Sequence, residues 1–161
     1  MPDVTPSGII SEPVANLRTL LSTCATFQTW TSTVSANAAL AKIYEIEKPS
    51  DDVVRPFAVV DRGGEFEIEV IDAGNAYTTS GSLFLLLEGA IAEANRSGMR
   101  NAYFQFANDI GGILNELISE AIPGAPITLA GLSLVSIARA SEEEQRAGID
   151  YMQAIFELTF R

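Results

Sequence analysis

The most informative stretch of the sequence is the last one, GIDYMQAIFELTFR, residues 148–161. From Tyr151 onward every second side chain is apolar. The apolar series is Met152, Ala154, Phe156, Leu158 and Phe160. Successive side chains of a β-strand point to opposite faces of a sheet, so the pattern predicts a strand with one buried face. The other face, with Tyr151, Gln153, Glu157 and Arg161, is predicted to be a mixed polar face.

The residues just before this strand supply its predicted neighbour. ITLAGLSLVSIARA, residues 127–140, is a second long strand pattern, with a bulge expected near Gly131. Only the polar segment SEEEQRAG, predicted as a loop, separates the two, and a short connection favours antiparallel pairing. Pairing with 130–140 would tie down the end of the chain, because termini otherwise fray.

Three helices are predicted. The longest covers residues 100–122 and packs its apolar stripe on the last strand, until Pro123 and Gly124 end it. The stripe is Tyr103, Phe106, Ala107, Ile110, Ile113, Leu114, Leu117, Ile118 and Ala121. A second helix is predicted over residues 12–30, where apolar residues repeat at spacings of three and four, and a short one over 36–41.

The middle of the chain is predicted to be rich in strands. Residues 41–47 alternate, and residues 55–72 are predicted to form a β-hairpin whose turn is Gly63-Gly64. In its second half, EFEIEVID, Phe66, Ile68 and Val70 are expected to point inward. A further strand is expected from Tyr77 to about Gly89.

Together these elements predict one α+β domain. Its mainly antiparallel sheet carries two main helices on one face, because an amphipathic helix must bury its stripe against a sheet. The domain is expected to span residues 13–161, after a flexible N-terminal arm of residues 1–12 that is rich in Pro, Ser and Gly. A length of 161 residues with 47% hydrophobic residues suits a single packed core.

Composition removes several classes of function. The formal net charge is −11, which disfavours a sequence-independent grip on DNA or an anionic membrane, since both need clustered Lys and Arg. The chain has no histidine, so Ser-His-Asp triads and His metal ligands are excluded. The single cysteine, Cys24, is predicted to be a buried apolar side chain. No signal peptide or membrane-spanning run is recognised, so the protein is expected to be made in a cytoplasm.

Two groups of acidic residues are candidates for a site. Glu65, Glu67 and Glu69 project from one strand face, and the run Glu142, Glu143 and Glu144 lies in the terminal hairpin. Carboxylates at strand spacing could serve an inverting glycosidase or bind a hard cation, but three in line are more typical of a solvated face or of a patch for a basic partner. The sequence predicts no catalytic, cofactor or metal site.

The layout resembles the tail terminator, or tail completion, proteins of long-tailed bacteriophages. The resemblance rests on the arrangement LRTLLSTCATFQTW, AKIYEIE, RPFAVV, SGSLFLLLE, an amphipathic helix and the closing DYMQAIFELTFR, and it covers roughly residues 12–161. Related neck and head–tail connector proteins share similar plans.

The resemblance implies a structural virion protein without an enzymatic activity. Subunits of this family form a hexameric ring on the head-proximal end of the tail tube, halt tube polymerisation and meet a head-side connector or stopper protein. DNA passes through the lumen without specific binding, and no membrane or cofactor is involved. Charged residues are then candidates for the lumen or a subunit interface: Glu65, Glu67, Glu69, Arg55, Arg62, Arg139, Glu142, Glu143, Glu144 and Arg161.

Two other classes stay open from the residues alone. One is a small hydrolase that uses paired carboxylates such as Glu65 and Glu67. The other is a cytoplasmic binding module with a hydrophobic groove, which should have a deep pocket as a monomer.

Overall fold

The computed structural model describes residues 4–6, 8, 10–50, 53–72, 76–91, 98–119 and 126–160. Its helices are α1 (Glu12–Thr23), α2 (Ala25–Trp30), α3 (Ala36–Leu40), α4 (Met99–Leu117) and α5 (Glu142–Arg146). Its strands are β1 (Ile43–Glu45), β2 (Phe57–Asp72), β3 (Ala76–Ala90), β4 (Leu129–Arg139) and β5 (Tyr151–Phe160). They form a single sheet in the order β1-β2-β3-β5-β4, in which only β1 and β2 pair in parallel.

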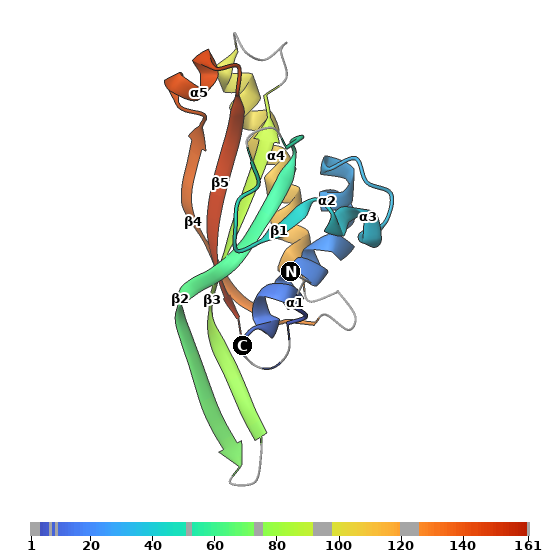
Figure 1. Cartoon of the computed structure of the whole chain (residues 1–161), viewed down its shortest axis with the longest axis vertical. Coiled ribbons are helices and arrows are strands. Elements are labelled where there is room, and N and C mark those ends of the chain that lie inside the picture. The colour runs from blue at the N-terminus through green and yellow to red at the C-terminus, as the bar shows by residue number, and fades with distance from the viewer. Residues whose placement is uncertain are drawn as a thin grey trace.

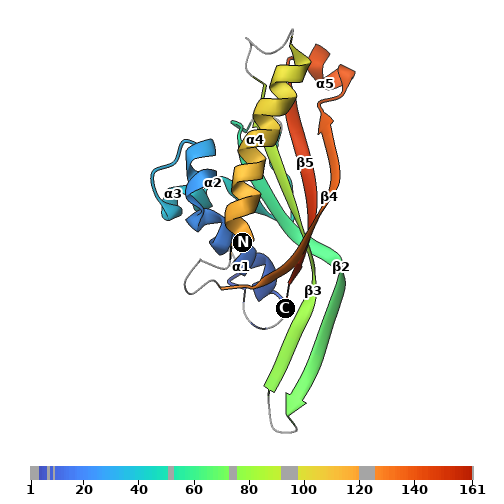
Figure 2. The ribbon, with the colours of Figure 1, turned by 180° about the vertical axis from the view of Figure 1, so that it is seen from behind.

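The predicted α+β architecture is confirmed. Figure 2 shows α4 lying along one face of the sheet with α1, α2 and α3 beside it, and Figure 1 shows the opposite face. The core lies between these layers and joins Leu17, Leu21 and Phe27 of the helices to Leu85, Leu87 and other strand residues. Burying these side chains is worth roughly 1.5–3 kcal/mol each, so this interface dominates the stability of the domain.

Strand β5 has the predicted form and neighbour. It pairs antiparallel with β4 and also with β3, which places the end of the chain in the interior of the sheet. Its apolar series is buried: Met152, Ala154, Phe156, Leu158 and Phe160. The expected bulge near Gly131 is present as a register shift between Leu129 and Gly131, and a second shift follows Leu134.

The prediction of one continuous helix over residues 12–30 is wrong. Cys24 has extended backbone angles, φ −70° and ψ 119°, and divides the segment into α1 and α2. The carboxylate of Glu116 in α4 accepts hydrogen bonds from the backbone N–H groups of Ala25 (2.8 Å) and Thr26 (2.9 Å). A side chain from a distant helix therefore caps the start of α2 and makes the interruption favourable.

The prediction of a hairpin turn at Gly63-Gly64 is also wrong. Strand β2 continues through both glycines, and the register with β3 shifts between Arg62 and Phe66. A Cβ atom on Gly63 would lie 2.7 Å from the backbone carbonyl carbon of Ser82. A Cβ atom on Gly81 would lie 3.0 Å from Cα of Phe66 and clash with the carbonyl oxygen of Glu65. The glycines therefore permit close approach of two long strands at a bulge, which is their other common role.

Beyond this bulge the two strands leave the body of the protein. Residues 65–72 of β2 and 76–81 of β3 extend past the helices in both views (Figures 1 and 2). This pair of strand segments is called the arm from here on and is distinct from the predicted N-terminal arm. Phe66, Ile68 and Val70 were predicted to point into a core, but they are 40%, 45% and 63% exposed. Phe66 still contacts the ring of buried Phe160, with centroids 6.1 Å apart, so this apolar series continues the helix-covered face of the sheet. The helices do not reach far enough to cover it.

The remaining differences are local. The strand predicted over 41–47 is reduced to β1, and the segment predicted as the loop SEEEQRAG contains the short helix α5. A capping box between Ser141 and Glu144 makes this turn helical. The helix predicted over 100–122 is α4, and residues 120–122 lie outside the described part of the chain. The same is true of residues 1–3, 7 and 9 of the predicted N-terminal arm 1–12. Within the described residues, no helix is long and apolar enough to span a membrane.

Candidate assembly surface

Glu65, Glu67 and Glu69 lie on the arm and are exposed. They alternate with Phe66, Ile68 and Val70, so they project from the face of the arm opposite to the helix-covered face. Their neighbours on β3 include Ser80, which is opposite Glu67, and Thr78, which is opposite Glu69. Catalytic carboxylate pairs flank the bond that they cleave inside a cleft, whereas these three lie in a row on an exposed strand face. Their geometry is that of an acidic surface that faces solvent or a partner.

Arg55 is not part of this surface. Its Nε donates to Oε1 of Glu88 at 2.8 Å, and its side chain is only 10% exposed. Glu88 is fully buried, and the ammonium group of Lys48 lies 2.8 Å from its other carboxylate oxygen. The ring of Tyr151 lies 4.7 Å from both cations, so its face adds a cation–π contact to each. The ion pairs of Glu88 with Arg55 and Lys48 hold the segment before β2 against the face of the sheet that the helices leave open.

Sequence reasoning missed Glu88, whose signal was a lone carboxylate at the end of the apolar run LFLLLE. A buried charge needs a partner, so this Glu alone could have pointed to an internal cation. It could not have named Lys48 or Arg55, which are brought to β3 by a loop from elsewhere in the chain.

Arg139 forms a two-point ion pair within the chain. Its Nε and NH2 groups donate to the carboxylate of Asp150 at 3.0 and 2.7 Å, which fixes the β4–β5 connection at its base. These hydrogen bonds raise the pKa of the Arg139 guanidinium above its ordinary value. Arg62 is exposed at the β2 bulge, and Arg161 lies outside the described residues.

The three acidic residues after Ser141 have different environments. Glu142 and Glu143 are exposed in the first turn of α5, and Glu142 makes only an open ion pair with Arg146 at 3.6 Å. Glu144 accepts hydrogen bonds from the Ser141 backbone N–H (2.8 Å) and the Tyr151 hydroxyl (2.9 Å), which together lower its pKa. Burial first, and then the bond to Glu144, raises the pKa of Tyr151 to about 12. Glu144 is therefore a structural residue, while its two neighbours face solvent.

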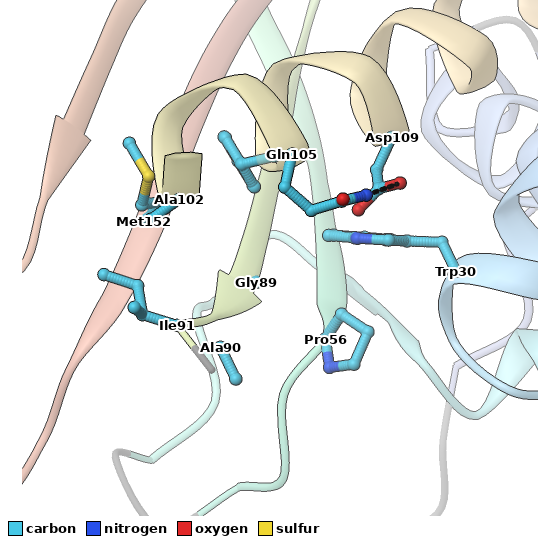
Figure 3. Close-up of a pocket in the computed structure, with 10 residues that line it drawn as sticks. Trp30, Pro56, Gly89, Ala90, Ile91, Ala102, Gln105, Asp109 and Met152 are labelled. Atoms are coloured by element: carbon cyan, nitrogen blue, oxygen red, sulfur yellow. Dashed lines mark hydrogen bonds between the residues drawn. The ribbon is translucent and has the colours of Figure 1, made fainter. Parts of the chain in front are cut away.

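The concave site shown in Figure 3 is small. It encloses ≈ 200 Å³ between α2, α4 and the end of β3, and Trp30 and Gln105 are among the residues that line it. Ligand pockets are typically roughly 300–1,000 Å³, with several convergent polar groups. Here the side-chain amide of Gln105 donates a hydrogen bond to the carboxylate of Asp109 at 3.1 Å, so these two polar groups are paired with each other. A wider hollow of ≈ 530 Å³ shares Trp30 and Asp109 with it and is open to solvent.

The outer strand β4 forms an apolar surface that sequence reasoning did not single out. Leu132, Leu134 and Val135 are 36%, 54% and 55% exposed. Within the described residues, no strand lies beside β4 on the side away from β5. The signal was present, because residues 127–138 contain no charged residue, whereas natural edge strands usually carry charges or proline.

In the described part of the chain, no three acidic or cysteine side chains gather in a group that could hold a metal ion. No protein family model matches the chain, and no curated protein matches its sequence. The described surface has two exposed sheet edges, one on the arm and one on β4.

Proposed function

We propose that this protein is a structural subunit of a bacteriophage virion, a tail terminator that forms a ring on the tail tube. In that role the ring stops polymerisation of the tube and joins the tail to the head-side connector or stopper protein. The proposal rests on the resemblance in the arrangement of elements and on the geometry of the sheet. A hexamer is the assembly that the resemblance implies.

One observation carries the proposal. The sheet has an unpaired edge on each side, β4 on one and the β2 strand of the arm on the other, among the residues described. Exposed edges with apolar side chains pair readily with another chain. A contact between opposite edges of identical subunits is head-to-tail, and such a contact closes a ring when the rotation between subunits brings the last copy back to the first; otherwise it gives an open filament. The chain thus carries both halves of a self-association surface.

The charge of the protein fits the passage of DNA. With a net charge of −11, the subunit repels rather than binds a polyanion. Glu65, Glu67 and Glu69 are exposed and suited to a lumen or to the arginines of a neighbour. DNA is then predicted to cross the ring without specific contacts.

The test is the assembly state. Native mass spectrometry and negative-stain imaging of the concentrated protein, with and without the tail tube protein of the same phage, should give closed rings and tube ends capped by them. A protein that stays monomeric under both conditions refutes the proposal.

Another neck or head–tail connector component has the same plan and is the alternative. A terminator binds the tube protein and shortens tubes assembled in its presence, whereas a connector component binds head-side proteins and leaves tube length unchanged. A gene position between the head-completion genes and the gene of the major tail protein is expected in either case.

A further inference from the structure

The arm and β4 each present an unpaired strand edge, and the edge of β4 is long enough to receive the whole edge of the arm. The arm presents the outer side of β2 from Glu65 to Val70, and β4 presents its outer side over eleven residues. In the sheet order β1-β2-β3-β5-β4 these edges lie on opposite sides. They cannot meet within one subunit, but the arm of one copy can lie beside β4 of another.

The side chains of the two edges also match on the helix-covered face. Phe66, Ile68 and Val70 alternate along β2 and so share one face of the arm, and the contact of Phe66 with the core residue Phe160 identifies it as the helix-covered face. On β4, Leu132 pairs with Leu158 and Leu134 with Phe156, and both partners are buried on the same face. If the two edges pair, these exposed apolar residues become cross-strand neighbours, the arrangement that stabilises adjacent strands.

On the opposite face the match is one of charge. Glu65, Glu67 and Glu69 would repel an acidic strand, and the chain as a whole carries a net charge of −11. Residues 127–138 are free of charge, and Ser133, which is opposite Glu157 on β5, presents a hydroxyl group on this face. Strand β4 itself therefore contains no acidic residue that would repel the three glutamates.

The neighbouring flank of α4 extends the apolar surface. Tyr103, Ala107, Leu114 and Ile118 follow one another at helical spacing and share one flank of the helix. Thr26 of α2 contacts the other flank, and Figure 2 shows α4 between α2 and β4, so this flank is turned toward β4. Tyr103 is 40% and Ile118 48% exposed, which leaves apolar contact area beside the β4 edge.

We propose that residues 65–70 of β2 in one subunit pair edge to edge with β4 of a second copy, so that the sheet continues from subunit to subunit. The inference rests on the proposed ring and names the contact that builds it. Main-chain hydrogen bonds supply the attachment, as in other cases of strand addition, and the apolar and uncharged faces select the partner.

Cysteine cross-linking tests the contact directly. Ile68→Cys and Leu134→Cys place thiols at exposed positions, 45% and 54% exposed, on the arm and on β4. The native thiol of Cys24 does not interfere, because it is fully buried and burial raises its pKa to about 12. Val34→Cys, at a position 96% exposed on neither edge, is the control for chance encounters.

A short bis-maleimide linker should join Ile68→Cys to Leu134→Cys in mixtures, while each variant alone stays uncoupled. The double variant should give a ladder of covalent oligomers. Cross-linking no stronger than with the Val34→Cys control, or equally strong between two Ile68→Cys chains, overturns the contact. Circular dichroism and melting curves establish that each variant is folded.

The outcome separates this contact from the ring itself. Wild-type rings in negative stain without cross-linking between arm and β4 would refute the contact and leave the proposed function standing. Cross-linked open filaments without rings would support the contact and refute the ring. A wild-type protein without rings whose variants also fail to cross-link would refute both.

Discussion

The buried carboxylate of Glu88 offers the sharpest test of which interactions stabilise this domain. Glu88→Gln keeps the shape of the side chain and an oxygen that can accept the hydrogen bond from Arg55, which is now 2.8 Å long. It removes the negative charge. The cations of Arg55 and Lys48 then lie beside a neutral amide, in a site where Glu88 itself is 0% exposed.

The size of the effect follows from the burial of the three groups. Removing one partner of a fully buried ion pair destabilises a protein by about 3–5 kcal/mol. Here the side chain of Arg55 is 10% and that of Lys48 34% exposed, so water relieves part of the loss. We expect the free energy of unfolding to fall by about 2–4 kcal/mol. For a domain of this size, that lowers the melting temperature by about 5–15 °C.

The assay is urea denaturation together with calorimetry, and Glu67→Gln is the matched control. Glu67 is an exposed glutamate on the arm, and its substitution should change stability by no more than about 0.5 kcal/mol. A double-mutant cycle with Arg55→Met should give a coupling energy of about 0.5–3 kcal/mol. If Glu88→Gln is no more destabilising than Glu67→Gln, the ion pair does not hold the segment before β2, and the reasoning fails.

Three further predictions follow from other contacts. Glu116→Gln should lower the free energy of unfolding by about 1 kcal/mol, since it weakens the cap of α2. Burial opposes its ionisation, but hydrogen bonds from α2 lower the pKa of Glu116 below the ordinary value of 4.5. The extra free energy of unfolding of the wild-type protein over Glu116→Gln, measured from denaturation curves, should therefore be fully present above pH 4.5. It should vanish as the pH falls through the lower pKa of the folded state, and a stability difference independent of pH contradicts the prediction. Gly81→Ala should destabilise by about 1–3 kcal/mol because its Cβ would meet the backbone of β2, whereas Gly64→Ala, with nothing within 4 Å, should be nearly neutral; equal melting temperatures would contradict this. Leu134→Glu should abolish self-association in sedimentation experiments without unfolding the subunit, and Val34→Glu should not; rings that survive Leu134→Glu would count against the β4 contact.

The acidic residues of the arm show how much of the candidate surface could be predicted from the sequence. Alternation alone placed Glu65, Glu67 and Glu69 on one exposed strand face, and the structure agrees. The same alternation predicted a buried face for Phe66 and its neighbours, which is wrong. Alternation defines two faces of a strand, but it contains no information on whether a helix reaches far enough to cover one of them.

The sequence by itself determined the elements whose signal is local. The period of two in β5 and the helical spacing in α4 follow from the direction in which successive side chains point, and this is a property of neighbouring residues. The α+β class and the antiparallel β4–β5 pair followed from these patterns and from one short connection.

Only the tertiary structure decided the features that depend on distant partners. The interruption at Cys24 is capped by Glu116, which hydrogen-bonds to Ala25 across 91 positions of the chain. Gly63-Gly64 lies at a bulge rather than a turn, with Ser82 of β3 packed against Gly63 and Gly81 packed against Glu65 and Phe66. Local propensity is a weak guide in each of these segments, so contacts with residues far along the chain decide the conformation.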